Sequence, residues 1–176
     1  MSGRLRVVEP GLDLSVGALV VYGGYGLGRV TARRQRNGGD TEDPTIVLDF
    51  ASGLSVILPL ERAESCLRPP AGARAFADVR TVLRSPNPTV EPSWQVRTRT
   101  SRAKIAAGDP VGLAEVVRDA VERQRGVAAG PARASAEQEL YLKARRLLAA
   151  ELAVAAGVDE SQAENWIESQ LERDAD

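Results

Sequence analysis

The chain has 176 residues, in which 23 lysines and arginines almost balance 24 aspartates and glutamates, for a formal net charge of −1. This length suits one or two small domains, and the near-neutral charge excludes a protein that coats nucleic acid with a uniformly basic surface. There is no histidine and a single cysteine, Cys66, which excludes His-dependent enzymes, metalloenzymes and an intrachain disulfide, so we expect no catalytic residue, metal or cofactor.

Charge is distributed unevenly along the chain. Arginines and Lys104 outnumber the acids between residues 71 and 110, whereas residues 151–176 are strongly acidic and contain Arg173 as their one cation. Only the middle of the chain is therefore suited to hold phosphate. The sequence has no long apolar run and no charged-then-apolar leader, so we expect a cytoplasmic protein that does not contact a membrane.

The first half of the chain has the pattern of short strands joined by tight turns. A tail at residues 1–13 has no clear periodicity and is expected to be flexible. After it, apolar runs alternate with glycine-rich and Asn/Asp-rich turns, which is typical of hairpins. The expected strands are Leu19–Tyr22, Arg29–Thr31, Thr45–Phe50 and Leu54–Leu58. Residues 14–70 are therefore predicted to form a small antiparallel β-barrel of the Tudor or SH3 kind.

Residues 71–176 are expected to form an all-α domain, after a boundary marked by the prolines of Arg68–Gly72. Apolar residues recur there at helical spacing, with capping residues or prolines ahead of the runs. Five helices are predicted: Ala73–Arg84, one from Pro92 to just before Gly108, one opened by Asp109 and Pro110, one from Ser135 to just before Gly157, and one capped by Asp159. Trp166 lies on the apolar face of the last helix and is expected in the core. The predicted fold class is α+β with two domains.

The helix that begins near Pro92 carries Trp94 within the densest basic run of the chain. The residues three, four and seven positions after Trp94 are Arg97, Thr98 and Ser101, so this face is not apolar. We expect the opposite side of the helix to pack, through the small residues Val96, Ala103 and Ala107. On this interpretation the side chains that point outward are Trp94, Arg97 and Lys104.

An exposed tryptophan beside arginines is suited to nucleic acid, because apolar wedges enter base steps and cations hold phosphates. The sequence leaves one structural alternative open. Trp94 is then covered by a neighbouring loop, where Pro86, Pro88 and Pro92 provide apolar contacts.

The motifs of both halves resemble those of the CarD/CdnL family of bacterial RNA polymerase-binding transcription regulators. The family's N-terminal Tudor-like domain, also found in the transcription-repair coupling factor, is matched by Val16-Gly17, Val20-Val21-Tyr22, Gly26 and Val56–Pro59. In the helical half, the matching motifs are Trp94 with Arg97 and Arg99, Ala114–Asp119, and Lys143–Leu152. The resemblance covers nearly all of the chain that is expected to be ordered.

The resemblance implies a regulator that binds two partners. The N-terminal barrel would bind the β subunit of RNA polymerase, with contacts expected at Arg34, Arg36, Val56, Ile57 and Pro59. The helical domain would lie at the upstream edge of the melted promoter, where Trp94 wedges the minor groove. Phosphate contacts are expected from Arg97, Arg99, Arg102 and Lys104. Such a monomer would stabilise the open complex while binding DNA weakly and without sequence specificity.

Three positions depart from the family pattern. Gly23 and Tyr25 stand where the family usually has proline and histidine, and Ile57 stands where a basic residue is common. The arginines at 33, 34 and 36 are equally compatible with a solvated hairpin end. The second functional hypothesis is therefore a diverged protein-binding adaptor of the same fold that does not contact DNA.

Overall fold

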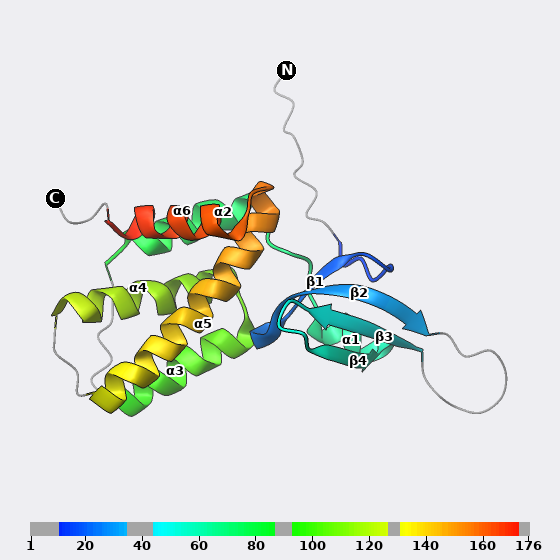
Figure 1. Ribbon diagram of the computed structural model, residues 1–176, viewed down its shortest axis with the longest axis horizontal. Helices are drawn as coiled ribbons and strands as arrows, with labels where there is room; N and C mark the ends of the chain where they lie inside the picture. Colours follow the sequence, from blue (N-terminus) through cyan, green and yellow to red (C-terminus); the bar gives the residue numbers. More distant parts are fainter. Residues whose placement is uncertain (1–10, 35–43, 87–92, 127–130, 173–176) are drawn as a thin grey trace, which may run out of the picture.

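The protein folds into a sheet and a helical bundle that lie side by side along the long axis of the molecule (Figure 1). The structure is a computed structural model, and it describes residues 11–34, 44–86, 93–126 and 131–172. The predicted α+β class is confirmed. Within the described residues, no helix is both long and apolar enough to cross a membrane.

The four predicted strands are present as β1 (Leu19–Tyr22), β2 (Gly26–Arg34), β3 (Thr45–Phe50) and β4 (Ser55–Pro59). They pair antiparallel in the order β1-β2-β3-β4, so β1 and β4 lie at opposite edges of an open sheet. The predicted antiparallel arrangement of the small Tudor-like domain is therefore confirmed, but its strands form an open sheet rather than a closed barrel. The short strand β1 instead pairs on its outer edge with the linker, where Val21 and Arg68 exchange backbone hydrogen bonds of 2.9 and 3.1 Å.

The core of the sheet half follows the two-residue alternation of its strands. Val30, Ile46 and Leu48 are fully buried on one face, as expected for side chains that alternate between faces. Leu12, within the tail predicted at residues 1–13, packs against this core, so that part of the expectation was wrong. Residues 1–10 lie outside the described residues.

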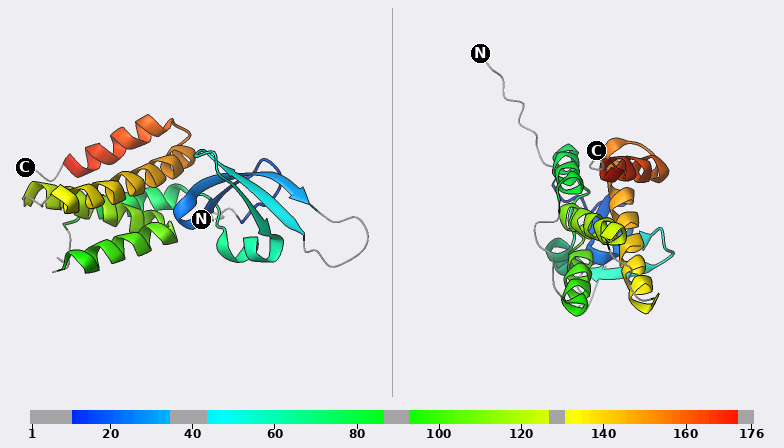
Figure 2. Two further views of the ribbon diagram at one scale, coloured as in Figure 1. Left: turned by 60° about the horizontal axis from the view of Figure 1, so that its bottom comes forward. Right: turned by 90° about the vertical axis from the view of Figure 1, so that its left-hand side faces the viewer.

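A helix that the sequence did not reveal, α1 (Leu60–Cys66), follows β4 and packs against one face of the sheet (Figure 2, left). Ala63 is its one fully buried residue. Seven residues with a single buried position give too little periodicity to predict a helix.

The helical half contains the five predicted helices: α2 (Ala73–Arg84), α3 (Trp94–Ala107), α4 (Pro110–Gly126), α5 (Pro131–Ala156) and α6 (Glu160–Glu172). The expected glycine stops are confirmed, because Gly108 and Gly157 have φ values of 68° and 66°, the left-handed conformation that glycine tolerates best. Two starts differ from the prediction. α5 begins before Ser135, and α3 begins at Trp94 after Ser93, whose hydroxyl accepts the Val96 N–H at 3.2 Å.

The core of the helical half is formed by apolar residues from all five helices. Its fully buried side chains include Val79, Leu83, Leu113, Val117, Leu148, Leu152 and Ile167. Trp166 packs against this core and meets Phe76 edge to face, with 4.9 Å between ring centroids. Its predicted core position is therefore confirmed.

The two halves meet at Gly23–Gly26, a turn with three glycines and Tyr25, which we call the glycine turn. A Cβ atom on Gly23 would lie 2.6 Å from the Ala106 carbonyl oxygen, and one on Gly26 would lie 2.5 Å from Leu147 Cδ2. Gly108 in turn abuts the backbone of Gly23. Glycine is required at such close approaches because any side chain would force the two halves apart.

A buried ion pair joins the linker to the helical half. Arg68 binds Glu151 with both terminal nitrogens, one of them at 2.8 Å, and Glu151 also accepts the Ala71 N–H at 2.7 Å. Arg68 further donates to the Gly108 carbonyl. The contact between the halves is thus fixed by paired charge as well as by close packing.

Candidate nucleic-acid and polymerase interfaces

Helix α3 packs through a different face from the one that we predicted. Its buried residues are Thr98 and Ile105, whereas Ala103 and Ala107 are exposed and Val96 is half-buried. Ile105 decides the orientation because it offers far more apolar surface for burial than an alanine does. The predicted packing face was therefore wrong.

Trp94 is half-buried at the first position of α3, and the prediction that it points fully outward was wrong. Its position shares a helical face with Thr98 and Ser101, which line a small pocket between α3, α4 and α5. The indole nitrogen of Trp94 is shielded from solvent. Of the three prolines proposed as its cover, Pro86 is exposed, and Pro88 and Pro92 lie outside the described residues.

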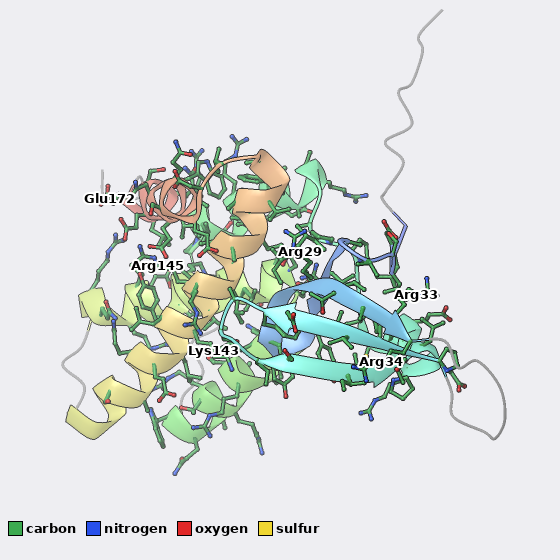
Figure 3. The ribbon with its side chains drawn as sticks, turned by 45° about the vertical axis from the view of Figure 1, so that its right-hand side comes forward. Arg29, Arg33, Arg34, Lys143, Arg145 and Glu172 are labelled. Carbon is green, nitrogen blue, oxygen red and sulfur yellow. The ribbon has the colours of Figure 1, made fainter. Side chains whose placement is uncertain are left out.

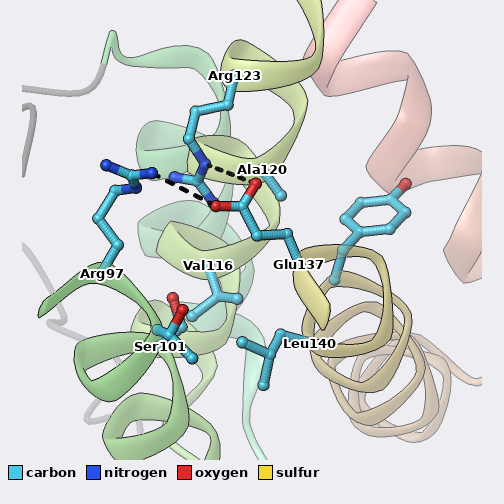
Figure 4. Close-up of a pocket in the computed structure, with 9 residues that line it drawn as sticks. Arg97, Ser101, Val116, Ala120, Arg123, Glu137 and Leu140 are labelled. Atoms are coloured by element: carbon cyan, nitrogen blue, oxygen red, sulfur yellow. Dashed lines mark ion pairs between the residues drawn. The ribbon is translucent and has the colours of Figure 1, made fainter. Parts of the chain in front are cut away.

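Two of the predicted DNA-binding cations are engaged within the protein. Arg97 Nη2 lies 3.6 Å from Glu137 Oε1, and the other carboxylate oxygen of Glu137 lies 3.6 Å from Arg123 Nε (Figure 4). Lys104 Nζ lies 2.9 Å from Glu115 Oε2. These side chains turn toward α4 and α5 because acids on those helices compensate their charge, so the outward orientation predicted for them was wrong.

Arg99 and Arg102 are exposed. Helical spacing places them on the side of α3 that carries Gln95 and Ala106, away from Arg97 and Lys104. Neither forms an ion pair with any residue in the part of the chain that the structure describes. Of the four predicted phosphate contacts, these two are thus the ones that remain available to a ligand.

The predicted polymerase contacts fall on the two faces of the sheet. Along β4, Ile57 and Pro59 are exposed, while Val56 is half-buried and packs against the sheet core. Val56 faces inward because neighbouring residues of a strand point to opposite faces, so it does not share a surface with Ile57. Arg36 lies outside the described residues.

Strand pairing builds an outer face of the sheet that the sequence did not reveal. Ile57 is opposite Val47, which is opposite Ala32, and the next row consists of Pro59, Thr45 and Arg34. Ile57 is 57% exposed, and Arg34 lies at one end of this face (Figure 3). Only the register between strands could have identified Ala32 and Val47 as neighbours of Ile57.

Tyr25 is a further exposed aromatic residue, at the junction between the halves. Its ring lies 5.0 Å from that of Tyr22 and 5.9 Å from that of Phe50, yet the residue is 55% exposed. The stack fixes the orientation of the glycine turn next to the end of α3. The sequence marked Tyr25 only as a departure from the family pattern.

Comparison with known families divides the chain at the same place as the fold does. Residues 14–71 match the model of the CarD-like/TRCF RID domain, and residues 78–168 match that of the CarD C-terminal domain. Domains of this kind belong to transcription regulators that interact with RNA polymerase. The two matches take in the sheet with α1 and most of the helical bundle. The chain therefore belongs to the CarD/CdnL family.

Proposed function

We propose that this protein binds the β subunit of RNA polymerase through the outer face of its sheet and stabilises the open promoter complex through α3. It acts as a monomer, with Trp94 at the minor groove of the upstream bubble edge. The observation that carries the proposal is the presence of both family domains in one chain, joined by the glycine turn and the Arg68–Glu151 pair.

The polymerase-binding part of the proposal rests on the exposed Ile57, with the half-buried Ala32 and Val47 in the same row and the exposed Arg34 in the next. An apolar residue as exposed as Ile57 (57%) on an edge strand is unfavourable in water and is suited to a protein partner. Arg34 adds a positive charge, and Arg36, two positions later in the sequence, adds a second one.

The DNA-binding part rests on Trp94 together with Arg99 and Arg102. Trp94 is half-buried at the first position of α3, and we propose that its exposed part inserts at an opened base step. The two exposed arginines supply contacts to the phosphate backbone, which position a protein without reading sequence.

The mechanism requires no covalent chemistry. A protein that binds the forked upstream edge better than closed duplex shifts the equilibrium toward the open complex by its difference in affinity for the two states. A tenfold preference corresponds to about 1.4 kcal/mol, enough to lengthen the lifetime of the open complex about tenfold if the whole effect falls on the closing rate.

An Ile57→Glu variant tests the polymerase contact. We expect it to weaken binding to an isolated β-subunit lobe at least tenfold, because a carboxylate replaces apolar contact area. The matched control is Val16→Glu, which places the same charge at a position that is 62% exposed but lies outside the paired rows. Equal binding by the two variants and the wild type would exclude this face.

The second candidate is an adaptor of the same fold that does not contact DNA. It is favoured by the ion pairs that hold Arg97 and Lys104 within the protein and by the partial burial of Trp94. On this hypothesis, the chain binds the β subunit but leaves the lifetime of the open complex unchanged. That lifetime, measured on a defined promoter with and without the wild-type protein, distinguishes the two candidates.

A further inference from the structure

We infer that the nucleic-acid surface extends from α3 onto α5, where Lys143 and Arg146 hold the DNA backbone together with Arg99 and Arg102. This inference rests on the proposed contact between α3 and DNA. It adds a second helix and two residues to the surface, and it replaces Arg97 and Lys104 as phosphate contacts.

The first observation is that the described cations of α3 and α5 fall into two groups, those that form ion pairs within the protein and those that do not. Arg97 and Lys104 pair with acids of α5 and α4, and Arg145 lies 2.9 Å from Glu164 and 2.8 Å from Glu168. The remaining described cations of these two helices are all exposed and form no ion pair with any residue in the described ranges: Arg99, Arg102, Lys143 and Arg146. Among the described side chains of the two helices, the positive charge without an ion pair is therefore concentrated in these four residues.

The second observation is that α3 and α5 run side by side in the same direction. Near their beginnings, Arg97 pairs with Glu137. Further along, both helices reach the glycine turn: a Cβ on Gly24 would lie 3.2 Å from Ala106 Cα, at the end of α3, and one on Gly26 would lie 2.5 Å from Leu147 Cδ2, in the middle of α5. These two contacts align the helices, so the position of a residue along the axis of α3 can be compared with that of a residue along α5.

Arg102 and Lys143 occupy equivalent levels on the two helices. Arg102 precedes Ala106 by four residues, and Lys143 precedes Leu147 by four, so each cation lies one turn before the contact of its helix with the glycine turn. Figure 3 shows Lys143 on the side of α5 that looks toward α3 and the near end of the sheet. Both cations are exposed at this level, so a nucleic-acid backbone that crosses the two helices here can contact both.

The third observation is a hollow beside Lys143 and Arg146. It is a shallow depression, open to solvent, with a volume of about 430 Å³, and it is also lined by Glu139, Leu142, Arg145 and Glu164. Arg145 is already paired with two acids. The positive charge that the hollow can offer to a ligand therefore comes from Lys143 and Arg146, and the negative charge of Glu139 partly offsets it. Leu142, 51% exposed, offers apolar contact to a sugar.

The chemistry favours a nucleic-acid backbone over an acidic peptide. The four cations are spread over two neighbouring helices rather than gathered in one socket, which matches a ligand with regularly repeated charge. An acidic segment of polymerase remains an outcome that the experiment can detect.

The test is the salt dependence of binding to a fluorescein-labelled forked DNA duplex, measured by anisotropy with the full chain. The variant combines Lys143→Ala and Arg146→Ala, and Arg80→Ala is the control, because Arg80 is also exposed but lies on α2. Each lost phosphate contact lowers the slope of log K against log salt by about one. We expect the double variant to lower the slope by about two, the control to leave it unchanged, and Lys143→Arg with Arg146→Lys to restore it.

Three results would overturn the inference, and they differ in what they say of the proposed function. If Arg99→Ala with Arg102→Ala weakens fork binding while the α5 variant behaves like Arg80→Ala, the DNA surface is confined to α3 and the proposed function stands. If neither pair nor Trp94→Ala affects fork binding, both proposals fail. If the α5 variant weakens binding to the β subunit instead of the fork, Lys143 and Arg146 contact protein.

Discussion

At the scale of single residues, Glu151 shows how the chain compensates a buried charge. The residue is 2% exposed, and its oxygens accept hydrogen bonds from Arg68 and from the Ala71 N–H. A carboxylate removed from water is tolerated only when such donors replace its hydration. Because Arg68 also forms the backbone bridge to Val21, this one acid connects the helical half to the edge of the sheet.

We expect Glu151→Ala to lower the free energy of unfolding by about 2 kcal/mol. Breaking a buried pair costs about 3–5 kcal/mol, but the Arg68 side chain is 32% exposed and water recovers part of the loss. The control is Glu115→Ala, whose pair with Lys104 is about one-third exposed and should be worth less than about 1 kcal/mol. Urea denaturation measures both, and equal losses would contradict the assignment.

The two tryptophans should differ in their contribution to stability. Trp166 packs against the core of the helical half and against Phe76, so Trp166→Ala should cost about 3 kcal/mol. Trp94 is half-buried and does not belong to that core, so Trp94→Ala should cost about 1 kcal/mol. If thermal unfolding shows that Trp94→Ala is the more damaging change, Trp94 is primarily structural.

At the scale of elements, the helix ends at Gly108 and Gly157 are matched in conformation but not in surroundings. Both glycines have nearly the same positive φ, and both follow the last residue of a helix. A Cβ on Gly108 would strike the backbone of Gly23, whereas one on Gly157 would meet nothing within 4 Å. Comparing alanine substitutions at the two sites therefore separates the cost of crowding the junction between the halves from the cost of the left-handed conformation.

Alanine at these two sites should therefore have unequal effects. Gly157→Ala should cost about 1–2 kcal/mol, the penalty for placing an L-residue in this conformation. Gly108→Ala should cost about 1–3 kcal/mol more, because the added methyl group also overpacks the junction. Chemical denaturation of both variants checks this, and an equal cost would mean that the junction yields easily.

The sequence was sufficient to predict most elements and insufficient to predict their surfaces. Strand alternation and capping residues identified four strands and five helices, because those signals are local. The outer row of the sheet depends on strand register, and the pairing of Arg97 with Glu137 joins residues 40 positions apart. The face through which α3 packs could not be predicted because the helix has no continuous apolar stripe, and a single residue, Ile105, orients it by its burial.

At the scale of the whole molecule, the two halves are joined by close packing and by paired charge. The glycine turn contacts both α3 and α5, and Arg68 reaches Glu151 and Gly108 from the linker. A protein held on polymerase by its sheet would therefore present Trp94, Arg99 and Arg102 at a fixed place, and tethering raises the effective concentration of a weak DNA contact. Weak binding to free DNA is consistent with a strong effect within the complex.

The most direct test of this account is the lifetime of the open complex on a defined promoter, at concentrations where the protein saturates polymerase. We expect the wild type to prolong the lifetime and Trp94→Ala to lose most of that effect while it binds the β subunit as well as the wild type does. Arg80→Ala, on the exposed side of α2, should behave like the wild type. A Trp94→Ala variant that binds polymerase and prolongs the lifetime fully would contradict the role of α3 and favour the adaptor.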